Sequence, residues 1–358
     1  MSCSWHCAAQ GRRYSVATLL SFRYGTGRLG QGVSACTWTR PLSNNNFVIG
    51  GHGNRNCGSS ANSSGVGEIV ARSQLLTPAE KNTFWQNGFV VLPSFLNMSV
   101  VDELRHVFPR LFAGQFSTGI YPDEWHWREG ISLPSASREI CNAWKADHSV
   151  RRVILSELIG RLIADLMNWS DGTRIAQDDV LWKPAGGTAV GFHQDSRYIS
   201  EQFVPYENNS VTLWMALDDA DSENGCVEYA CGSHRWARHD SRKADNVAQE
   251  GFHASSDAYD TPVHRAAEKA GVDRAQVRIA GTAVPAGGAI LHHQDVWHGS
   301  QRNKSAARLR RALVGHYIRS DARFRESPHP TYIYGRYKLA DSTALHDSFF
   351  PLTFRPRL

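Results

Sequence analysis

The second half of the chain sets the strongest limit on the fold. From about Arg174 onward, short runs rich in β-branched and aromatic residues alternate with glycines and prolines. Short strands separated by turn residues are typical of a β-sandwich or barrel, whereas parallel sheets need helices between their strands. We therefore predict a mainly β fold with strands at 179–184, 211–219, 226–231, 288–293 and 310–318.

Helical patterns flank these strands. Thr77, Pro78 and Glu80 form the pattern of a capping box at a helix start, and Asn87-Gly88 supplies the stop. A short buried strand is expected next, over 89–96. Apolar spacing and capping residues predict further helices at 99–112, interrupted near Pro109, at 148–169 and at 261–271. The polar segment 235–280, which contains the last of these helices, is expected to form a lid or binding loop.

Length and charge narrow the class of protein. The 358 residues suffice for one large domain or two average ones, and no apolar run is long enough to cross a bilayer. The net charge of +5 comes mainly from the N-terminus, since Met1–Gly67 contains no Asp or Glu. The remainder is near neutral, so a nucleic-acid partner is not expected. The seven cysteines show neither a disulfide framework nor a zinc-finger pattern.

The acid-free N-terminus predicts a targeting segment. Arginine and serine without acidic residues are typical of a transit peptide, so we interpret 1–72 as a disordered leader and 73–358 as the folded domain. A mitochondrial destination is the first expectation. A plain disordered tail is the alternative, as are a plastid, the peroxisome and the cytoplasm. The chain ends in PRL, which differs from the peroxisomal SKL signal at its first two positions, the second an exchange of Lys for Arg.

The tripeptide His-Gln-Asp occurs twice, at 193–195 and at 293–295. Residues two apart on a strand point to the same side, so the His and Asp of one copy fit two ligand positions of one metal ion. Two histidines and one carboxylate suit non-haem Fe(II), because they leave positions open for other ligands. His298 and the pair Arg310-Arg311 lie downstream, and arginine is a bidentate partner for a carboxylate.

The longer motifs resemble the phytanoyl-CoA dioxygenase family of Fe(II)/2-oxoglutarate oxygenases. The resemblance covers roughly 75–320 and includes LTPAEKNTFWQNGFVVLPSFL, KPAGGTAVGFHQDS, LWMALDDADSENGCVEYACGSH and GGAILHHQDVWHGSQRNKSAARLRRAL. It implies a double-stranded β-helix, the cupin-like jelly roll, with helices packed outside. It also implies an enzyme that uses Fe(II), 2-oxoglutarate as cosubstrate and O2, with ascorbate as a supporting reductant.

The resemblance assigns roles to single residues. It implies that the metal ligands and catalytic residues are His193, Asp195 and His298. The 2-oxoglutarate anchor falls on Arg310, with Arg311 as a rival, because the segment before the pair is one residue longer than usual and a slip by one residue reverses the face of a strand. The positions expected to line the cosubstrate pocket are Gln194, Trp214, Ser300 and Lys183. In the second His-Gln-Asp, His293 matches a non-ligand histidine of relatives.

The resemblance implies hydroxylation of a C–H bond with release of succinate and CO2. The substrate would be a small organic or lipid-derived molecule, with acyl-CoA thioesters as one class. Two alternatives stay open. One is a non-catalytic or sensing relative of the same fold, and the other is a zinc hydrolase on a cupin-like fold. The sequence predicts a small-molecule partner and gives no indication of oligomeric state.

Overall fold

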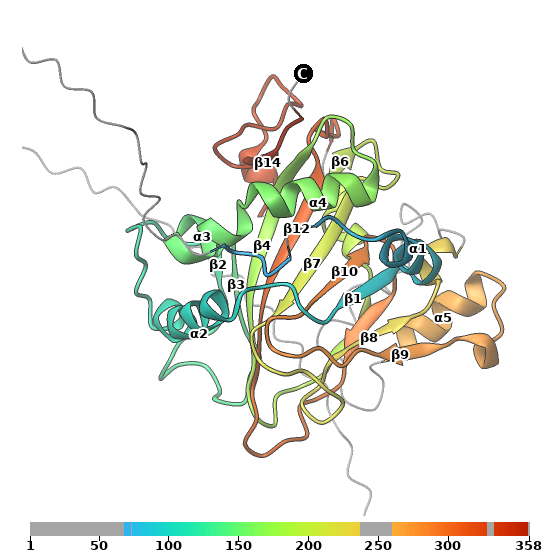
Figure 1. Ribbon diagram of the computed structural model, residues 1–358, viewed down its shortest axis with the longest axis horizontal. Coiled ribbons are helices and arrows are strands. Elements are labelled where there is room, and N and C mark those ends of the chain that lie inside the picture. Colours follow the sequence, from blue (N-terminus) through green and yellow to red (C-terminus); the bar gives the residue numbers. More distant parts are fainter. Residues whose placement is uncertain (1–67, 73, 237–259, 328–332, 357–358) are drawn as a thin grey trace, which may run out of the picture. The chain divides into compact units, whose positions relative to one another are not determined.

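Two antiparallel sheets form the core of the computed structural model, which describes residues 68–72, 74–236, 260–327 and 333–356 (Figure 1). The large sheet has the order β1-β10-β7-β12-β4-β3-β2, and β14 also pairs with β4. Its strands are β1 (Phe89–Leu92), β10 (Ala289–His293), β7 (Ser210–Ala216), β12 (Arg310–Arg319), β4 (Thr173–Lys183), β3 (Arg138–Cys141), β2 (Glu124–Trp125) and β14 (Leu352–Phe354).

The small sheet has the order β5-β11-β8-β9. Its strands are β5 (Val190–His193), β11 (His298–Ser300), β8 (Val227–Ala230) and β9 (Ile279–Gly281), and a separate pair joins β6 (Phe203–Val204) to β13 (Arg323–Phe324). This is the jelly-roll architecture expected from the sequence.

Side-chain alternation along the large sheet creates two apolar layers. On β7, Trp214 and Ala216 share a cluster with Val227 and Tyr229 of the small sheet. The residues that alternate with these two along β7 belong to another cluster, which also contains the buried side chains of the helices. Because neighbouring residues of a strand point to opposite faces, one face of the sheet lines the space between the sheets and the other binds the helices.

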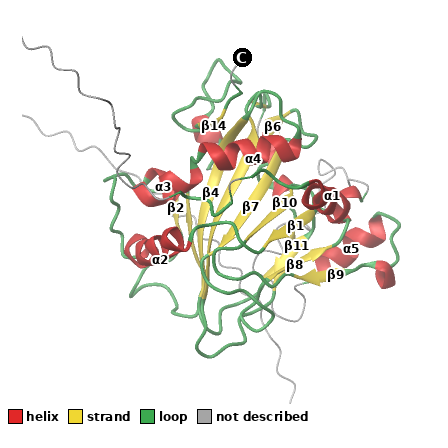
Figure 2. Ribbon diagram, viewed as in Figure 1, coloured by secondary structure: helices red, strands yellow, loops and turns green. Residues whose placement is uncertain are grey.

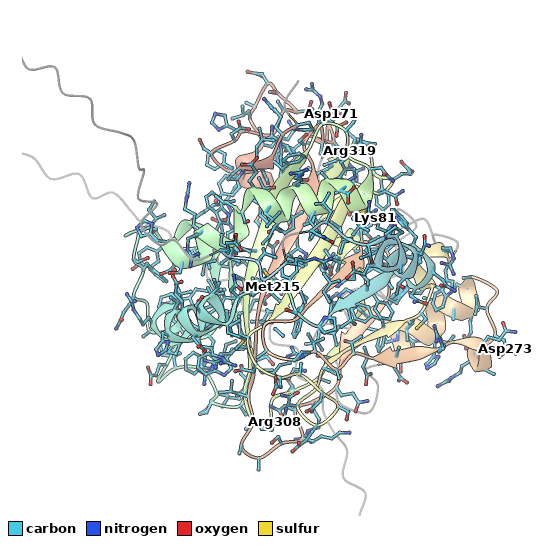
Figure 3. The ribbon with its side chains drawn as sticks, viewed as in Figure 1. Lys81, Asp171, Met215, Asp273, Arg308 and Arg319 are labelled. Carbon is cyan, nitrogen blue, oxygen red and sulfur yellow. The ribbon has the colours of Figure 1, made fainter. Side chains whose placement is uncertain are left out.

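Helices cover the outer face of the large sheet (Figure 2). They are α1 (Pro78–Asn87), α2 (Met98–Phe112), α3 (His148–Ile154) and α4 (Glu157–Met167), whereas α5 (Thr261–Lys269) follows the polar segment and packs near β5. Lys81 of α1 forms an ion pair with Asp165 of α4, at 2.8 Å (Figure 3 labels Lys81). In the described part of the chain, no helix is long and apolar enough to span a membrane.

Several expected elements are confirmed with shifted ends. The capping box at Thr77 and Glu80 is present, and Gly88 ends α1 with a positive φ. The strand expected over 89–96 stops at Leu92, and β4 begins at Thr173 instead of 179. The helical region 148–169 is two helices, because Leu155 and Ser156 interrupt it and Ser156 is the N-cap residue of α4.

The expected interruption of α2 at Pro109 is wrong, since the helix continues to Phe112. Proline lacks the N–H that would bond to the carbonyl four residues earlier, here that of Arg105. Arg311 satisfies this carbonyl instead, because its Nη1 donates to Arg105 O at 3.1 Å. A side chain of β12 therefore replaces the missing hydrogen bond of the helix.

The folded domain begins before residue 73, the start expected from the sequence. Val70 is buried and bridges to Leu96, and the Ala71 N–H donates to Phe95 O, so native contacts reach upstream of residue 73. The expected leader 1–72 otherwise lies outside the described residues. The same holds for 237–259, the first part of the expected lid.

Arg311 supports a prediction about stability. Its guanidinium binds Asp218 through Nε and Nη2 at 2.9 and 2.8 Å, in addition to the Arg105 carbonyl. The change Arg311→Met removes these side-chain hydrogen bonds from half-buried acceptors, and we expect a loss of about 2 kcal/mol in the free energy of unfolding, measured with urea. The matched control Arg308→Met breaks exposed, solvent-screened ion pairs with Asp221 and Glu223 and should change the free energy of unfolding far less. Equal losses for the two variants would contradict this account.

Candidate metal and cosubstrate site

The small sheet brings two histidines together. His193 is the last residue of β5 and His298 the first residue of β11, and they are register partners in the antiparallel pair β5–β11. Their ring centroids lie 4.3 Å apart. Neither short strand was predicted as an element, although the sequence analysis placed His193 at a strand end.

Asp195 completes the group from a turn. It begins the 3-10 turn Asp195–Arg197, and the strand geometry expected for both His193 and Asp195 ends at His193, two residues before Asp195. Asp195 Oδ1 nevertheless lies 3.7 Å from His193 Nε2 and 3.5 Å from His298 Nε2. The three ligand atoms all lie within 4.8 Å of one another. Two imidazoles and one carboxylate converge on one point, as a three-ligand metal site requires.

The protonation states suit a metal cation. His193 Nδ1 bonds to Gly191 O at 2.9 Å, and His298 Nδ1 bonds to Val296 O at 3.1 Å. A carbonyl only accepts, so Nδ1 carries the proton in both rings and the Nε2 lone pair faces the group. Burial, together with the charge of the neighbouring histidine, lowers the pKa of His193 to about 4. Burial likewise lowers the pKa of His298 to about 4, against the opposing effect of Asp195.

Asp195 itself stays ionised. Burial alone would raise its pKa, but the charge of His298 and the hydrogen bond from His292 outweigh burial and hold the pKa well below the usual value. At neutral pH the group therefore consists of two neutral imidazoles and one carboxylate. A divalent cation can bind without displacing protons.

The second oxygen of Asp195 is fixed by the large sheet. Thr212 Oγ1 on β7 donates to Asp195 Oδ2 at 2.5 Å, and His292 Nε2 on β10 lies 2.9 Å from the same atom. The Tyr229 hydroxyl lies 2.9 Å from His292 Nδ1 and completes a buried chain of hydrogen bonds. With Oδ2 occupied, only Oδ1 is directed at the metal position, which favours monodentate binding by Asp195.

The supporting residues Thr212, His292 and Tyr229 were not identified from the sequence. A signal was present for one of them, because Trp214 was expected in the site and Thr212 lies two residues earlier on the same strand face. His292 carries no such signal, because it lies outside the repeated tripeptide 293–295.

The second His-Gln-Asp has a structural role and supplies no ligand to the group. His293 Nε2 bonds to Asn208 Oδ1 at 2.8 Å, and the Tyr206 hydroxyl donates to Asp295 Oδ1 at 2.6 Å. Its backbone supports the first copy, since the Ser196 N–H donates to Gln294 O and Gln194 Nε2 donates to Asp295 O at 2.6 Å. Gln194, expected to line the cosubstrate pocket, uses its amide nitrogen to join the two copies.

Two buried cations lie on the inner face near the triad. Arg310 and Lys183 are register partners on β12 and β4, and both are buried. Lys183 Nζ donates to Ser300 Oγ at 2.7 Å and to Gln301 O at 2.6 Å. The Arg310 guanidinium lies 5.5 Å from the Trp214 ring centroid and donates through Nη1 to Gly225 O. Burial, followed by the charge of Arg310, holds the pKa of Lys183 well below its usual value.

Arg310 has capacity for an anionic ligand. Its Nε is buried without a hydrogen-bond partner, and no carboxylate of the described residues forms an ion pair with it or with Lys183. An unpaired buried cation is unfavourable, so a ligand carboxylate at this position would satisfy both the charge and the free donor. Arg311 points to the opposite face and binds Asp218, which decides between the two arginines in favour of Arg310 as the inward cation.

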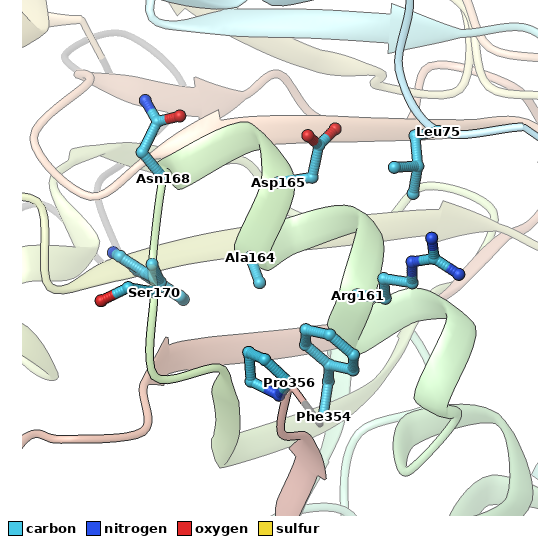
Figure 4. Close-up of a pocket in the computed structure, with 9 residues that line it drawn as sticks. Leu75, Arg161, Ala164, Asp165, Asn168, Ser170, Phe354 and Pro356 are labelled. Carbon is cyan, nitrogen blue, oxygen red and sulfur yellow. The ribbon is translucent and has the colours of Figure 1, made fainter. Parts of the chain in front are cut away.

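A surface hollow elsewhere on the molecule is separate from this site. Figure 4 shows it between α4 and the C-terminal segment, with Arg161, Asp165, Phe354 and Pro356 among its lining residues. It contains none of the triad residues and neither buried cation. It lies on the helical face of the large sheet, whereas the triad faces the space between the sheets.

The family model for phytanoyl-CoA dioxygenase (PhyH) matches residues 84–312, a range that includes the triad and Arg310. The chain belongs to the phytanoyl-CoA dioxygenase family. This protein is therefore a member of a family of iron- and 2-oxoglutarate-dependent dioxygenases, as the sequence motifs indicated, and its His-Asp-His group and buried arginine fit iron and 2-oxoglutarate.

Two curated proteins are similar in sequence to this chain. A probable alpha-ketoglutarate-dependent hypophosphite dioxygenase of Stutzerimonas stutzeri is 28% identical over 247 residues, which cover 68% of this chain and 79% of that protein. A 2-aminoethylphosphonate dioxygenase of the uncultured bacterium HF130_AEPn_1 is 24% identical over 157 residues, 43% of this chain and 56% of that protein. The chain thus matches little more than half of the second relative.

Solved structures share the fold. The epimerase SnoN from nogalamycin biosynthesis, in complex with Fe3+, alpha ketoglutarate and nogalamycin RO, superposes with a TM-score of 0.56 at 19% identity over 77% of this chain and 97% of its own. EctD from S. alaskensis with bound Fe has a TM-score of 0.56 at 15% identity over 78% and 92%. At these identities the likeness establishes the jelly-roll fold.

The lowered histidine pKa values predict metal binding that is insensitive to pH. Imidazoles with a pKa of about 4 are already neutral at pH 6, whereas two ordinary histidines would lose about tenfold or more in affinity between pH 8 and pH 6. We expect the Mn(II) dissociation constant, measured by electron paramagnetic resonance, to change by less than about threefold over this range. A tenfold gain in affinity on raising the pH from 6 to 8 would show that the histidines are not held neutral.

The contact between Thr212 and Asp195 predicts a loss of metal affinity without loss of fold. Thr212→Val keeps the shape of the side chain but removes the donor to Asp195 Oδ2, so the carboxylate is no longer held toward the metal. Loss of such a supporting hydrogen bond should weaken Mn(II) binding by about tenfold or more. Thr353→Val, a buried change of the same kind on β14, is the matched control and should leave affinity unchanged. A similar effect of both changes would indicate a general effect on stability.

Proposed function

We propose that this protein is an Fe(II)- and 2-oxoglutarate-dependent dioxygenase that hydroxylates a C–H bond of a small organic substrate and releases succinate and CO2. One observation carries the proposal. The triad of His193, Asp195 and His298 lies in the space between the two sheets, and the buried Arg310 in the same space has an unpaired donor. A metal triad alone would suit several reactions, but a buried cation near it suits a carboxylate cosubstrate.

The chain would hold both groups in the following way. His193 Nε2, His298 Nε2 and Asp195 Oδ1 would bind Fe(II), and Arg310 and the hydroxyl of Ser300 would bind the distal carboxylate of 2-oxoglutarate. Bound iron would supply coordination of the 2-oxo acid and of O2. Lys183 positions Ser300 and adds positive charge, while Trp214 packs against the Arg310 guanidinium. The apolar cluster between the sheets excludes water around them.

A zinc hydrolase on the same fold would need a metal-activated water but no buried cation for a cosubstrate. It would leave Arg310 as a buried cation with an unpaired donor. A non-catalytic relative would retain cosubstrate binding and lack turnover, so it differs from the proposal in succinate formation alone. The intact triad and the support for Asp195 favour the active enzyme.

Two relatives bear on the size of the substrate. Their names specify hypophosphite and 2-aminoethylphosphonate, both small hydrophilic molecules. These names support a small polar substrate more than an acyl-CoA thioester. The described parts of the segment expected to form a lid, 235–236 and 260–280, carry charges of both signs. Mixed charges are typical of a solvated surface and give no support for binding of CoA phosphates.

We also propose that the protein is imported into mitochondria. The support is the absence of acidic residues from Met1–Gly67 together with its arginines and serines. Microscopy of the full chain and of a form starting at Glu68, each fused to a fluorescent protein, provides the check.

The proposed function predicts a visible charge-transfer band when Fe(II) and 2-oxoglutarate are added without oxygen. We expect the band in the wild type and its loss in His193→Ala, because that variant lacks a metal ligand. In the matched variant His293→Ala, changed in the other His-Gln-Asp, the band should persist. For Arg310→Met, the 2-oxoglutarate concentration at half saturation should rise by about thirtyfold or more, as expected for the loss of about 2 kcal/mol from charge-assisted hydrogen bonds.

Circular dichroism and thermal melting of each variant provide the control for folding. Absence of the band in folded wild-type protein, together with stoichiometric zinc binding, would overturn the dioxygenase assignment in favour of a zinc site. A band without succinate formation across a substrate screen would favour the non-catalytic relative.

A further inference from the structure

A row of polar side chains crosses the inner face of the large sheet and begins at the metal triad. His292, Thr212 and His316 lie side by side on β10, β7 and β12, as the register of these strands shows. His316 Nδ1 bonds to Thr212 Oγ1 at 2.8 Å and lies 3.6 Å from Asp195 Oδ2. The row therefore contacts the carboxylate that is directed at the metal, and it lines the same space between the sheets.

The row continues toward β3 and becomes acidic. His316 Nε2 bonds to Asp179 Oδ2 on β4 at 2.8 Å, and Gln177 Nε2 donates to Asp179 Oδ1 at 2.7 Å. On β3, Cys141 is the register partner of Asp179, and Glu139 lies two residues before it on the same face. Ligand atoms of Glu139, Cys141 and Asp179 lie within 4.8 Å of one another.

Glu139 differs from Asp179 in its partners. Both oxygens of Asp179 are engaged, by His316 and Gln177. In the described part of the chain, the Glu139 carboxylate has neither a hydrogen bond nor an ion pair, and the residue is half-buried. Burial and the charge of Asp179 raise the pKa of Glu139 to about 8, against the opposing effect of His316. The carboxylate thus lacks the cation that would stabilise its charged form.

Arg310 and Glu139 therefore differ in the kind of partner that each lacks. On the Arg310 side, a buried cation has a free donor, and an anionic cosubstrate fits it. On β3, the carboxylate of the half-buried Glu139 lacks a cation. The proposed reaction needs a second organic molecule beside the metal. The row of polar side chains leads from Asp195 through His316 and Asp179 to the neighbouring Glu139. Charge complementarity then defines the group that the second molecule presents to this wall.

We propose that Glu139, supported by Asp179, selects a primary substrate that carries a cationic nitrogen group, such as an alkylammonium. The inference rests on the proposed function, because the substrate is placed relative to the metal of that site. An ammonium beside Glu139 would donate charge-assisted hydrogen bonds to its free oxygens. An anionic substrate or a purely aliphatic chain would leave the carboxylate uncompensated, so this wall disfavours both.

The test uses the charge-transfer band of the full chain with Fe(II) and saturating 2-oxoglutarate under anaerobic conditions. Occupation of the substrate position perturbs this band. The probes are straight-chain alkylammonium ions, alcohols and alkylsulfonates with the same alkyl chain, whose head groups are cationic, neutral and anionic. In the wild type, the alkylammonium should perturb the band at a concentration about tenfold or more below that of the matched sulfonate.

The variant Glu139→Gln keeps size and removes the charge, and it should reduce this preference to within about threefold. Glu139→Lys reverses the charge and should favour the sulfonate, which keeps the test decisive if one variant folds poorly. The control Glu129→Gln makes the same chemical change at an exposed position and should preserve the wild-type preference. All variants should retain the band itself, because Glu139 contacts neither the metal ligands nor Arg310.

Two results would overturn the inference while the proposed function stands. One is a normal band without preference for the cation, including no response to any probe. The other is a second equivalent of Mn(II) per chain that disappears in Glu139→Gln, because Glu139, Cys141 and Asp179 would then bind a metal ion. Failure of the proposed function itself would be recognised by a different result, the absence of the band in the wild type before any probe is added.

Discussion

The carboxylate of Asp195 joins the two sheets, and the rest of the site depends on this contact. Oδ1 faces the two histidines of the small sheet, while Oδ2 accepts hydrogen bonds from Thr212 and His292 of the large sheet. A buried carboxylate is tolerated only when its oxygens are satisfied. Here one oxygen is satisfied by the fold and the other is left for a cation, so the packing of the sheets and the metal geometry are set by the same residue.

Successive side chains of a strand point to opposite faces, which explains why the neighbours Arg310 and Arg311 have different roles. Arg310 points between the sheets beside Lys183, whereas Arg311 points outward, binds Asp218 and satisfies the carbonyl that Pro109 leaves free in α2. A one-residue change of register on β12 would exchange these roles. It would remove the buried cation from the site and the support from the helix at once, which links the cosubstrate position to the stability of the outer layer.

Much of this arrangement could be predicted from the sequence, and the failures have physical causes. The β-rich second half, the capping box and the triad were accessible because they depend on local pattern or on recognisable motifs. β5 and β11 were not, since each is only three or four residues long and their pairing joins segments about a hundred residues apart. Likewise, the continuity of α2 depends on Arg311, and the role of the second His-Gln-Asp depends on Asn208 and Tyr206. Contacts of this range leave no periodic signal in the chain.

Several buried polar side chains line the space between the sheets, and their free-energy cost indicates which of them serve the fold and which serve binding. Burying Arg310, Lys183, Asp179 and His316 costs free energy that an apolar lining of the same volume would avoid. His316 and Asp179 satisfy each other, which accounts for that pair within the fold. Arg310 and Glu139 are not satisfied in this way, because Arg310 Nε has no hydrogen-bond partner and, among the described residues, no cation pairs with the Glu139 carboxylate. Stability alone gives no reason for either residue, whereas two bound molecules of opposite charge account for both.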